Sequence, residues 1–76
     1  MIRRRIKIST INDKMKFIEK AITLPCEVDI KNGSKVIDAK SELGVLEINT
    51  ISNNPEVIIH STNEEYLDVF KDWIVD

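Results

Sequence analysis

His60 and Cys26 are the single histidine and the single cysteine of this 76-residue sequence. An imidazole can accept a phosphoryl group or bind a metal, and a thiol can act as a nucleophile. One residue of each kind excludes an internal disulfide and leaves too few ligands for an ordinary Cys/His zinc site. No paired carboxylates, glycine-rich phosphate loop or nucleophile-base set can be named beside them. The sequence therefore predicts a protein that is not an enzyme and that needs no metal or cofactor.

Ser41 is a third candidate, because it stands just before a short apolar stretch that has helical spacing. The free N–H groups and the dipole at a helix start favour a phosphate there, so Ser41 is a possible site of regulatory phosphorylation. The simpler interpretation is that Ser41 only caps the helix. Leu43 and Leu46 follow on that helix. They are either core residues or an exposed surface that binds a protein partner, and both interpretations stay open.

The basic residues are concentrated at the N-terminus. Residues 1–20 carry seven basic and two acidic side chains, whereas residues 21–76 carry four basic and eleven acidic ones. Arg3, Arg5 and Lys7 would form the wet face of a strand that could bind nucleic acid. The acidic pI of about 5.3 and the absence of interleaved aromatic side chains argue against this. We expect the basic segment to lie beside the acidic remainder of the same domain.

Length and composition indicate one domain spanning residues 1–76, with 42% hydrophobic and 32% charged residues. No window is long and apolar enough for a membrane span, and the basic start lacks the apolar stretch of a signal peptide. The sequence therefore predicts a cytoplasmic protein without membrane insertion, and a monomer is the simplest expectation.

Seven elements must position these residues. We predict a strand over 2–8 with Ile2, Ile6 and Ile8 on its dry face, a helix over about 12–23, strands over 26–31 and 35–39, a short helix after Ser41, a strand over 56–60, and a terminal helix on which Leu67, Phe70 and Ile74 form the apolar stripe. The fold class is α+β, with an antiparallel sheet covered by helices. The strand over 56–60 is expected at its centre.

Local signals mark the ends of these elements. On the first helix, Ile11, Met15, Ile18 and Ile22 are expected to form the buried stripe, with Phe17 and Ala21 widening it and Asn12 or Asp13 as the cap. Asn32-Gly33 predicts a type I′ hairpin turn, and Ser52-Asn53-Asn54-Pro55 a further turn. Thr62 and Glu65 have the spacing of a capping box. We expect Cys26 to be a small buried residue, and Phe70 and Trp73 to anchor the packing of the core.

The segment from Val28 to Leu46 resembles the middle of HPr, the phosphocarrier of the bacterial phosphoenolpyruvate-dependent sugar phosphotransferase system. Lys40-Ser41 followed by Leu43-Gly44-Val45-Leu46 is similar to the regulatory-serine motif of that family, with Glu42 where an apolar residue is usual. The resemblance implies the sheet order 1-4-2-3 with three helices on one face. It also implies that Ser41 is the position a kinase phosphorylates, and that Leu43 and Leu46 lie where family members contact partners.

The loop after the first strand departs from the family. Family members carry there a phosphoacceptor histidine, followed by an arginine and a proline, whereas residues 9–14 here read Ser-Thr-Ile-Asn-Asp-Lys and the loop is about five residues short. Asp13 would repel a phosphate at that place. The sequence therefore predicts an HPr-like domain that does not carry a phosphoryl group on histidine.

Such a domain would act as a regulatory or protein-binding module, with phosphotransferase components or an HPr kinase-like enzyme as its partners. The alternative is a functional phosphocarrier with His60 as a displaced acceptor. His60 ends the fourth strand, far in the resembled fold from the first helix, which disfavours that alternative. A nucleic-acid-binding module is the weaker alternative.

Overall fold

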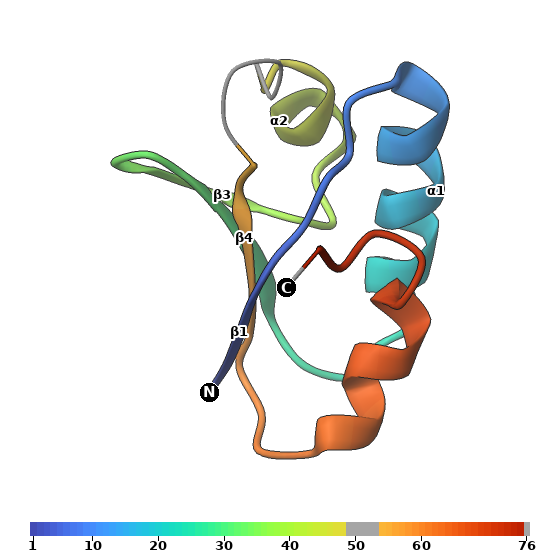
Figure 1. Ribbon diagram of the computed structural model, residues 1–76, viewed down its shortest axis with the longest axis vertical. Helices are drawn as coiled ribbons and strands as arrows, with labels where there is room; N and C mark the ends of the chain where they lie inside the picture. The colour runs from blue at the N-terminus through green and yellow to red at the C-terminus, as the bar shows by residue number, and fades with distance from the viewer. Residues whose placement is uncertain (49–53, 76) are drawn as a thin grey trace.

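A four-stranded antiparallel sheet with helices on one face forms the fold of the protein (Figure 1). The computed structural model describes residues 1–48 and 54–75. Its elements are β1 (Ile2–Arg5), α1 (Ile11–Ile22), β2 (Val28–Asn32), β3 (Lys35–Asp38), α2 (Glu42–Leu46), β4 (Glu56–Ile59) and the 3₁₀ helix η1 (Glu64–Phe70). The predicted element order, α+β class and sheet order β1-β4-β2-β3 are confirmed. No helix in the described ranges has the length and apolar character needed to cross a bilayer.

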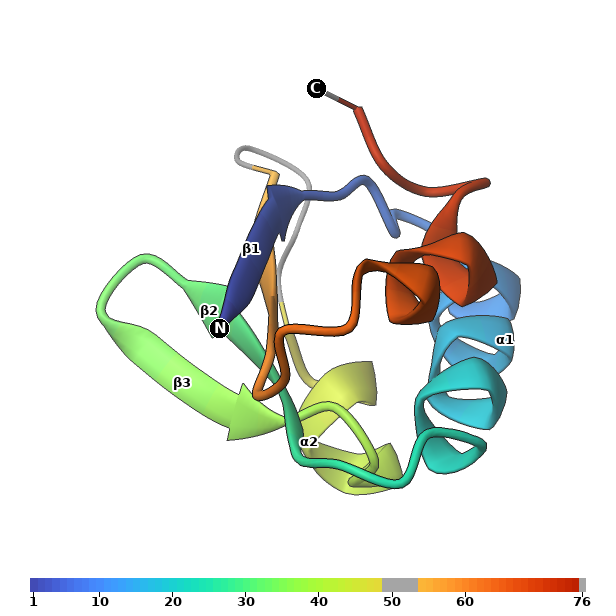
Figure 2. The same ribbon diagram turned by 90° about the horizontal axis from the view of Figure 1, so that it is seen from below.

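β4 is one of the two inner strands, together with β2, and its apolar sequence predicts an inner position. Ile59 pairs with Ile2 of β1 on one side and with Val28 of β2 on the other. The helix-facing apolar side chains Ile2, Val28, Ile30, Val57 and Ile59 are buried, so the sheet and helices enclose one core. Figure 2 shows the two layers edge-on, with β1 and β3 at the outer edges of the sheet.

The first strand is shorter than predicted, although its dry face is right. Ile2, Ile6 and Ile8 are buried, but β1 ends at Arg5. The amide of Ile6 still donates to the carbonyl of Pro55, just before β4, at 2.9 Å, and Ile6 also bridges Ile74. The amide of Lys7 then donates to the carbonyl of Trp73 at 2.8 Å. The chain therefore leaves the sheet here and is held by the C-terminal segment.

The hairpin between β2 and β3 lies one residue later than predicted. Asn32 pairs with Lys35, so the turn residues are Gly33 and Ser34. Gly33 alone has a positive φ, of 65°, and Asn32 does not. The predicted type I′ turn is wrong, because it needs two positive φ angles. The observed signs are those of a type II′ turn, which favours glycine at its first position.

The start and the buried side of α1 also differ from the prediction. The cap is Thr10, whose Oγ1 accepts a hydrogen bond from the amide of Asp13 at 3.0 Å, and neither Asn12 nor Asp13 caps the helix. Phe17, Ile18 and Ala21 are buried as expected, and Lys14 joins them. Ile11, Met15 and Ile22 are exposed, which contradicts their assignment to the core.

The last helix is a 3₁₀ helix that ends at Phe70, so it does not reach Ile74. Asn63, not Thr62, is its cap and accepts from the amide of Glu65, so the predicted capping box is wrong. Phe70 and Trp73 are packing anchors, as predicted. Cys26 is half-buried against the core rather than fully buried. Of the predicted turn at 52–55, Ser52 and Asn53 lie outside the described residues.

Candidate protein-docking surface

One flank of α1 is closed by aromatic side chains. Phe17 stacks on Phe70 of η1 with a centroid separation of 4.5 Å, and it meets Trp73 edge to face at 5.5 Å. The indole Nε1 of Trp73 also lies 3.5 Å from Oδ1 of Asp13. Aromatic pairs with this geometry stabilise beyond the area they bury. This side of α1 is therefore part of the hydrophobic core.

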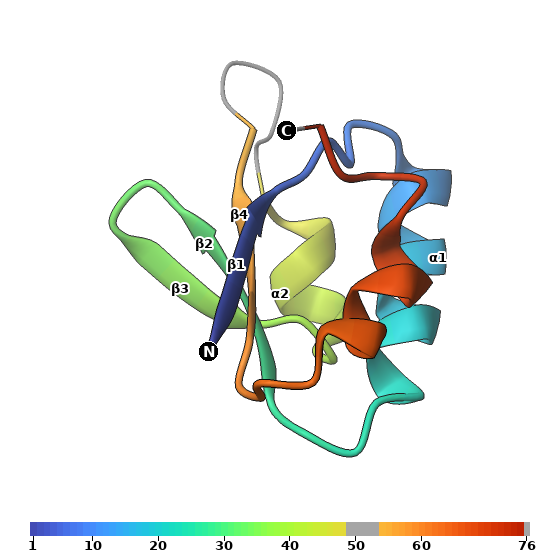
Figure 3. The ribbon, with the colours of Figure 1, turned by 60° about the horizontal axis from the view of Figure 1, so that its bottom comes forward.

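The other flank of α1 faces α2, which runs in the opposite direction. Nζ of Lys40, just before α2, donates to the carbonyl of Leu24 beyond the end of α1, at 2.9 Å. Nζ of Lys14, in the first half of α1, donates to the carbonyl of Ile48 beyond the end of α2, at 2.6 Å. These two lysines fix the ends of α2 against α1. Figure 3 shows α2, η1 and α1 together on the same side of the sheet.

Apolar side chains remain exposed along this second flank. Ile11, Met15 and Ile22 are spaced by four and seven residues, so they share one stripe of α1. Their exposed fractions are 73%, 38% and 59%, and Leu43 on α2 is 75% exposed. Leu43 lies in the first turn of α2, and Lys40 bonds the segment just before that turn to the chain beyond the end of α1. We call these four residues the α1–α2 surface.

The structure separates the two interpretations of the short helix. Leu43 is exposed, whereas Leu46 is half-buried and Val45 and Ile48 are fully in the core. Ser41 caps α2, as the sequence predicts, and its Oγ lies 3.4 Å from the amide of Gly44 that donates to it. Ser41 itself is half-buried. Leu43 is thus a surface residue two positions beyond a half-exposed serine.

His60 lies away from the start of α1. It follows β4, whose end and the start of α1 are at opposite ends of the fold in Figure 1. Its Nε2 is 2.7 Å from Oδ2 of Asp29 on β2. A carboxylate at that distance repels a phosphoryl group on the same nitrogen, because both carry negative charge. No other histidine exists to take this role.

The basic N-terminal segment lies beside acidic residues, as expected. Arg3 is 3.8 Å from Glu56, and Arg4 is 3.8 Å from Glu64. Nη1 of Arg5 donates to the carbonyl of Asn54 at 3.2 Å. These three arginines therefore have partners within the domain.

Sequence reasoning missed the exposed stripe and the buried lysine of α1. Lys14 lies four residues before Ile18 and three before Phe17, so it shares their side of the helix, and this spacing was the available signal. A long aliphatic stem allows lysine to be buried when its ammonium finds an acceptor, here the Ile48 carbonyl. Once Lys14 is inside, the buried arc turns away from Ile11 and Met15.

No three His, Cys, Asp or Glu side chains in residues 1–48 and 54–75 are grouped closely enough to bind a metal ion. The arrangement presents exposed apolar side chains on two adjacent helices, a capping serine two residues before one of them, and a histidine paired with aspartate. Comparison of the chain with protein-family models, with curated proteins and with solved structures gives no match.

Proposed function

We propose that this protein is an HPr-like protein-binding module that does not carry phosphate on histidine and that docks to its partner through the α1–α2 surface. The single observation behind the proposal is the exposure of Ile11, Met15, Ile22 and Leu43 on two adjacent helices. Exposed apolar side chains that share one surface are a common feature of protein interfaces. The sheet order β1-β4-β2-β3 is the one that the HPr resemblance implies, and it supports the comparison of α2 with the helix that family members use for docking.

The start of α1 supports the loss of phosphate transfer. The link from β1 to α1 contains no histidine, and the first turn of α1 carries Asp13. A helix start can favour a phosphoryl group, but a carboxylate in the same turn opposes it. His60, the alternative acceptor, lies beside Asp29. Both places therefore disfavour the added negative charge.

Ser41 offers a means of regulation within this proposal. It lies two residues before Leu43, so phosphorylation would put about two negative charges beside the apolar docking surface. Glu42 already contributes one negative charge there. Phosphate at Ser41 would therefore weaken docking to an apolar or acidic partner. The enzyme that the resemblance implies is an HPr kinase-like protein.

A titration of the ¹⁵N-labelled protein with purified bacterial enzyme I, followed by NMR, tests the proposal. We expect the amide signals of Ile11, Met15, Ile22 and Leu43 to shift together. The double variant Ile22→Ser/Leu43→Ser should bind at least about tenfold more weakly, because two apolar contacts are lost. Val36→Ser is the matched control, since Val36 is 53% exposed and lies on the sheet, away from this surface. Absence of binding, or equal loss in the control, would reject the proposal.

Incubation with enzyme I and phosphoenolpyruvate, followed by mass spectrometry, tests the second part. We expect no phosphohistidine, and incubation with an HPr kinase and ATP should modify Ser41 and leave the Ser41→Ala variant unmodified. Phosphohistidine at His60 that disappears in His60→Ala would instead identify a displaced phosphocarrier.

A further inference from the structure

β3 is an edge strand with outward-facing backbone groups. The register Asn32↔Lys35 and Ile30↔Ile37 places the hydrogen bonds of Lys35 and Ile37 toward β2, because bonded pairs alternate along an antiparallel ladder. The N–H and C=O of Val36 and the N–H of Asp38 therefore point away from the sheet. The carbonyl of Asp38 already accepts from the amide of Ser41 at 3.0 Å. Within the described part of the chain these three outward groups have no partner.

The opposite edge of the sheet is covered at the end of β1. The C-terminal segment runs beside the end of β1, where the amide of Val75 donates to the carbonyl of Arg5 at 3.0 Å and Ile74 bridges Ile6. No such segment covers β3 in the described residues, and Figure 2 shows its outer edge clear of other elements. On β1 the carbonyls of Arg3 and Arg5 already accept hydrogen bonds, whereas β3 presents three outward backbone groups to an additional strand.

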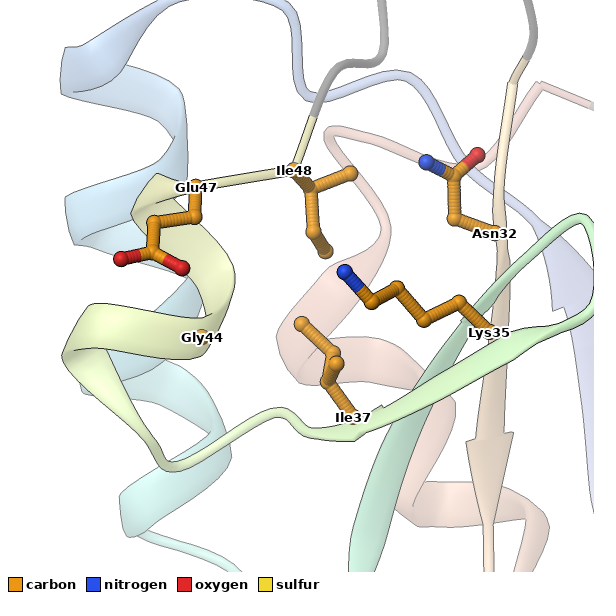
Figure 4. A pocket seen from close by; sticks show the side chains of 6 residues that line it. All are labelled: Asn32, Lys35, Ile37, Gly44, Glu47 and Ile48. Atoms are coloured by element: carbon orange, nitrogen blue, oxygen red, sulfur yellow. The ribbon is translucent and has the colours of Figure 1, made fainter.

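A pocket of about 410 Å³ lies beside β3, between this strand and α2 (Figure 4). Ile37 and Ile48 provide apolar walls, and Gly44 leaves the facing side of α2 without a side chain. Lys35 extends from β3 toward Ile48, whereas the carboxylate of Glu47 is turned away from Lys35 (Figure 4). The volume is near the lower end of the range for ligand pockets and suits one or two side chains.

The edge and the pocket together specify an occupant. Outward N–H and C=O groups on a strand are satisfied by an extended chain, and alternate side chains of that chain point to the helix side of the sheet. We propose that the β3 edge and the adjacent pocket bind an extended peptide segment of a partner protein as a fifth strand. One aliphatic side chain of that segment fills the space between Ile37 and Ile48, and an acidic side chain two positions away contacts Lys35.

A second copy of β3 fits this site less well. The residues of β3 that face the helix side are Lys35 and Ile37. A paired copy would bring a second ammonium group to that side and no carboxylate, so the two lysines would repel each other. A partner segment with an acidic residue neutralises Lys35 and therefore matches the site in charge as well as in shape.

Capped peptides that contain glutamate two positions before or after an isoleucine, in a threonine and serine background, provide the probe. We expect binding by NMR titration with the largest amide shifts at Val36, Asp38 and Gly44. Two N-methylated peptides should differ, one methylated at the odd-numbered and one at the even-numbered residues. One of them should lose binding and the other should keep it, because only one set of amides faces β3. Shifts confined to the α1–α2 surface, or insensitivity to N-methylation, would overturn the proposal.

Charge exchange provides the matched variants. Lys35→Glu should weaken binding of the glutamate peptide by about tenfold or more and should favour the peptide in which lysine replaces glutamate. Lys31→Glu is the control, because Lys31 lies beside β3 but on the other face of the sheet. The affinity of this variant for the glutamate peptide should stay unchanged. Equal effects of the two variants would contradict the proposal. Concentration-dependent dimerisation abolished by Lys35→Glu would assign the edge to a second copy instead.

Discussion

The two flanks of α1 both carry apolar side chains but differ in burial. On the η1 side, Phe17 is enclosed by Phe70 and Trp73. On the α2 side, Ile11, Met15 and Ile22 stay exposed although they are equally apolar. The difference lies in the neighbouring element, because α2 has only five residues and is held at its ends by lysine-to-carbonyl bonds. Hydrophobicity alone therefore does not decide which side of a helix becomes core.

The largest expected effect comes from the closed flank. Phe17→Ala removes a fully buried ring that contacts two aromatic side chains, so the free energy of unfolding should fall by about 3–5 kcal/mol. Ile22→Ala, on the open flank, should cost less than about 1 kcal/mol, since Ile22 is mostly exposed. Urea unfolding followed by circular dichroism compares the two. Equal losses would show that both flanks contribute to the core.

Lys14→Met tests the bond that holds α2 against the open flank. Methionine keeps an aliphatic stem, but the Ile48 carbonyl loses its charged donor, so unfolding should become easier by about 1–3 kcal/mol. Lys16→Met is the control, because Lys16 is exposed and should change stability by less than about 0.5 kcal/mol. If Lys14→Met is as stable as its control, packing alone positions α2.

Thr10→Ala tests the start of the helix that carries both flanks. Loss of the bond from the Asp13 amide should lower the free energy of unfolding by about 1 kcal/mol, and Thr10→Ser should restore most of it. Thermal unfolding of the three proteins measures the difference. A similar loss in Ser9→Ala would indicate a general effect of the segment rather than capping.

The smallest expected effect concerns the open flank itself. Leu43→Ser should change the free energy of unfolding by less than about 0.5 kcal/mol, because Leu43 is three-quarters exposed. Val45→Ser, two residues later and fully buried, should destabilise strongly. A large fall in the free energy of unfolding of Leu43→Ser would mean that Leu43 supports the fold rather than a partner contact.

The sequence was sufficient for the element order and for the dry faces of the strands, because β-strand alternation has a strict period of two. The period of a helix is less restrictive. Ile11, Met15 and Ile22 matched a buried stripe on α1 as well as Phe17 and Ala21 did, and only the position of η1 chose between them. The turn at Gly33 was misplaced by one residue, because Asn32 and Gly33 both tolerate a positive φ.

For the candidate site, the sequence located Ser41 and Leu43 but not the stripe on α1 beside them. Leu43 and Leu46 have the same residue type and similar spacing, so nothing local distinguishes the exposed one from the half-buried one. Lys14 was also missed, because its acceptor, the carbonyl of Ile48, lies 34 residues away in the chain. Such long-range partners are invisible to reasoning about neighbouring residues.

The sheet order also affects when the protein can fold during synthesis. β1 and β2 are joined only through β4, so neither has its inner neighbour until residues 56–59 have left the ribosome. The nascent chain can form α1 and the β2-β3 hairpin early. The apolar faces of its strands cannot be buried until the last quarter of the sequence has been synthesised. Ribosome-stalled chains ending before β4 should therefore be digested readily by protease, and resistance should appear abruptly once β4 and the C-terminal segment emerge.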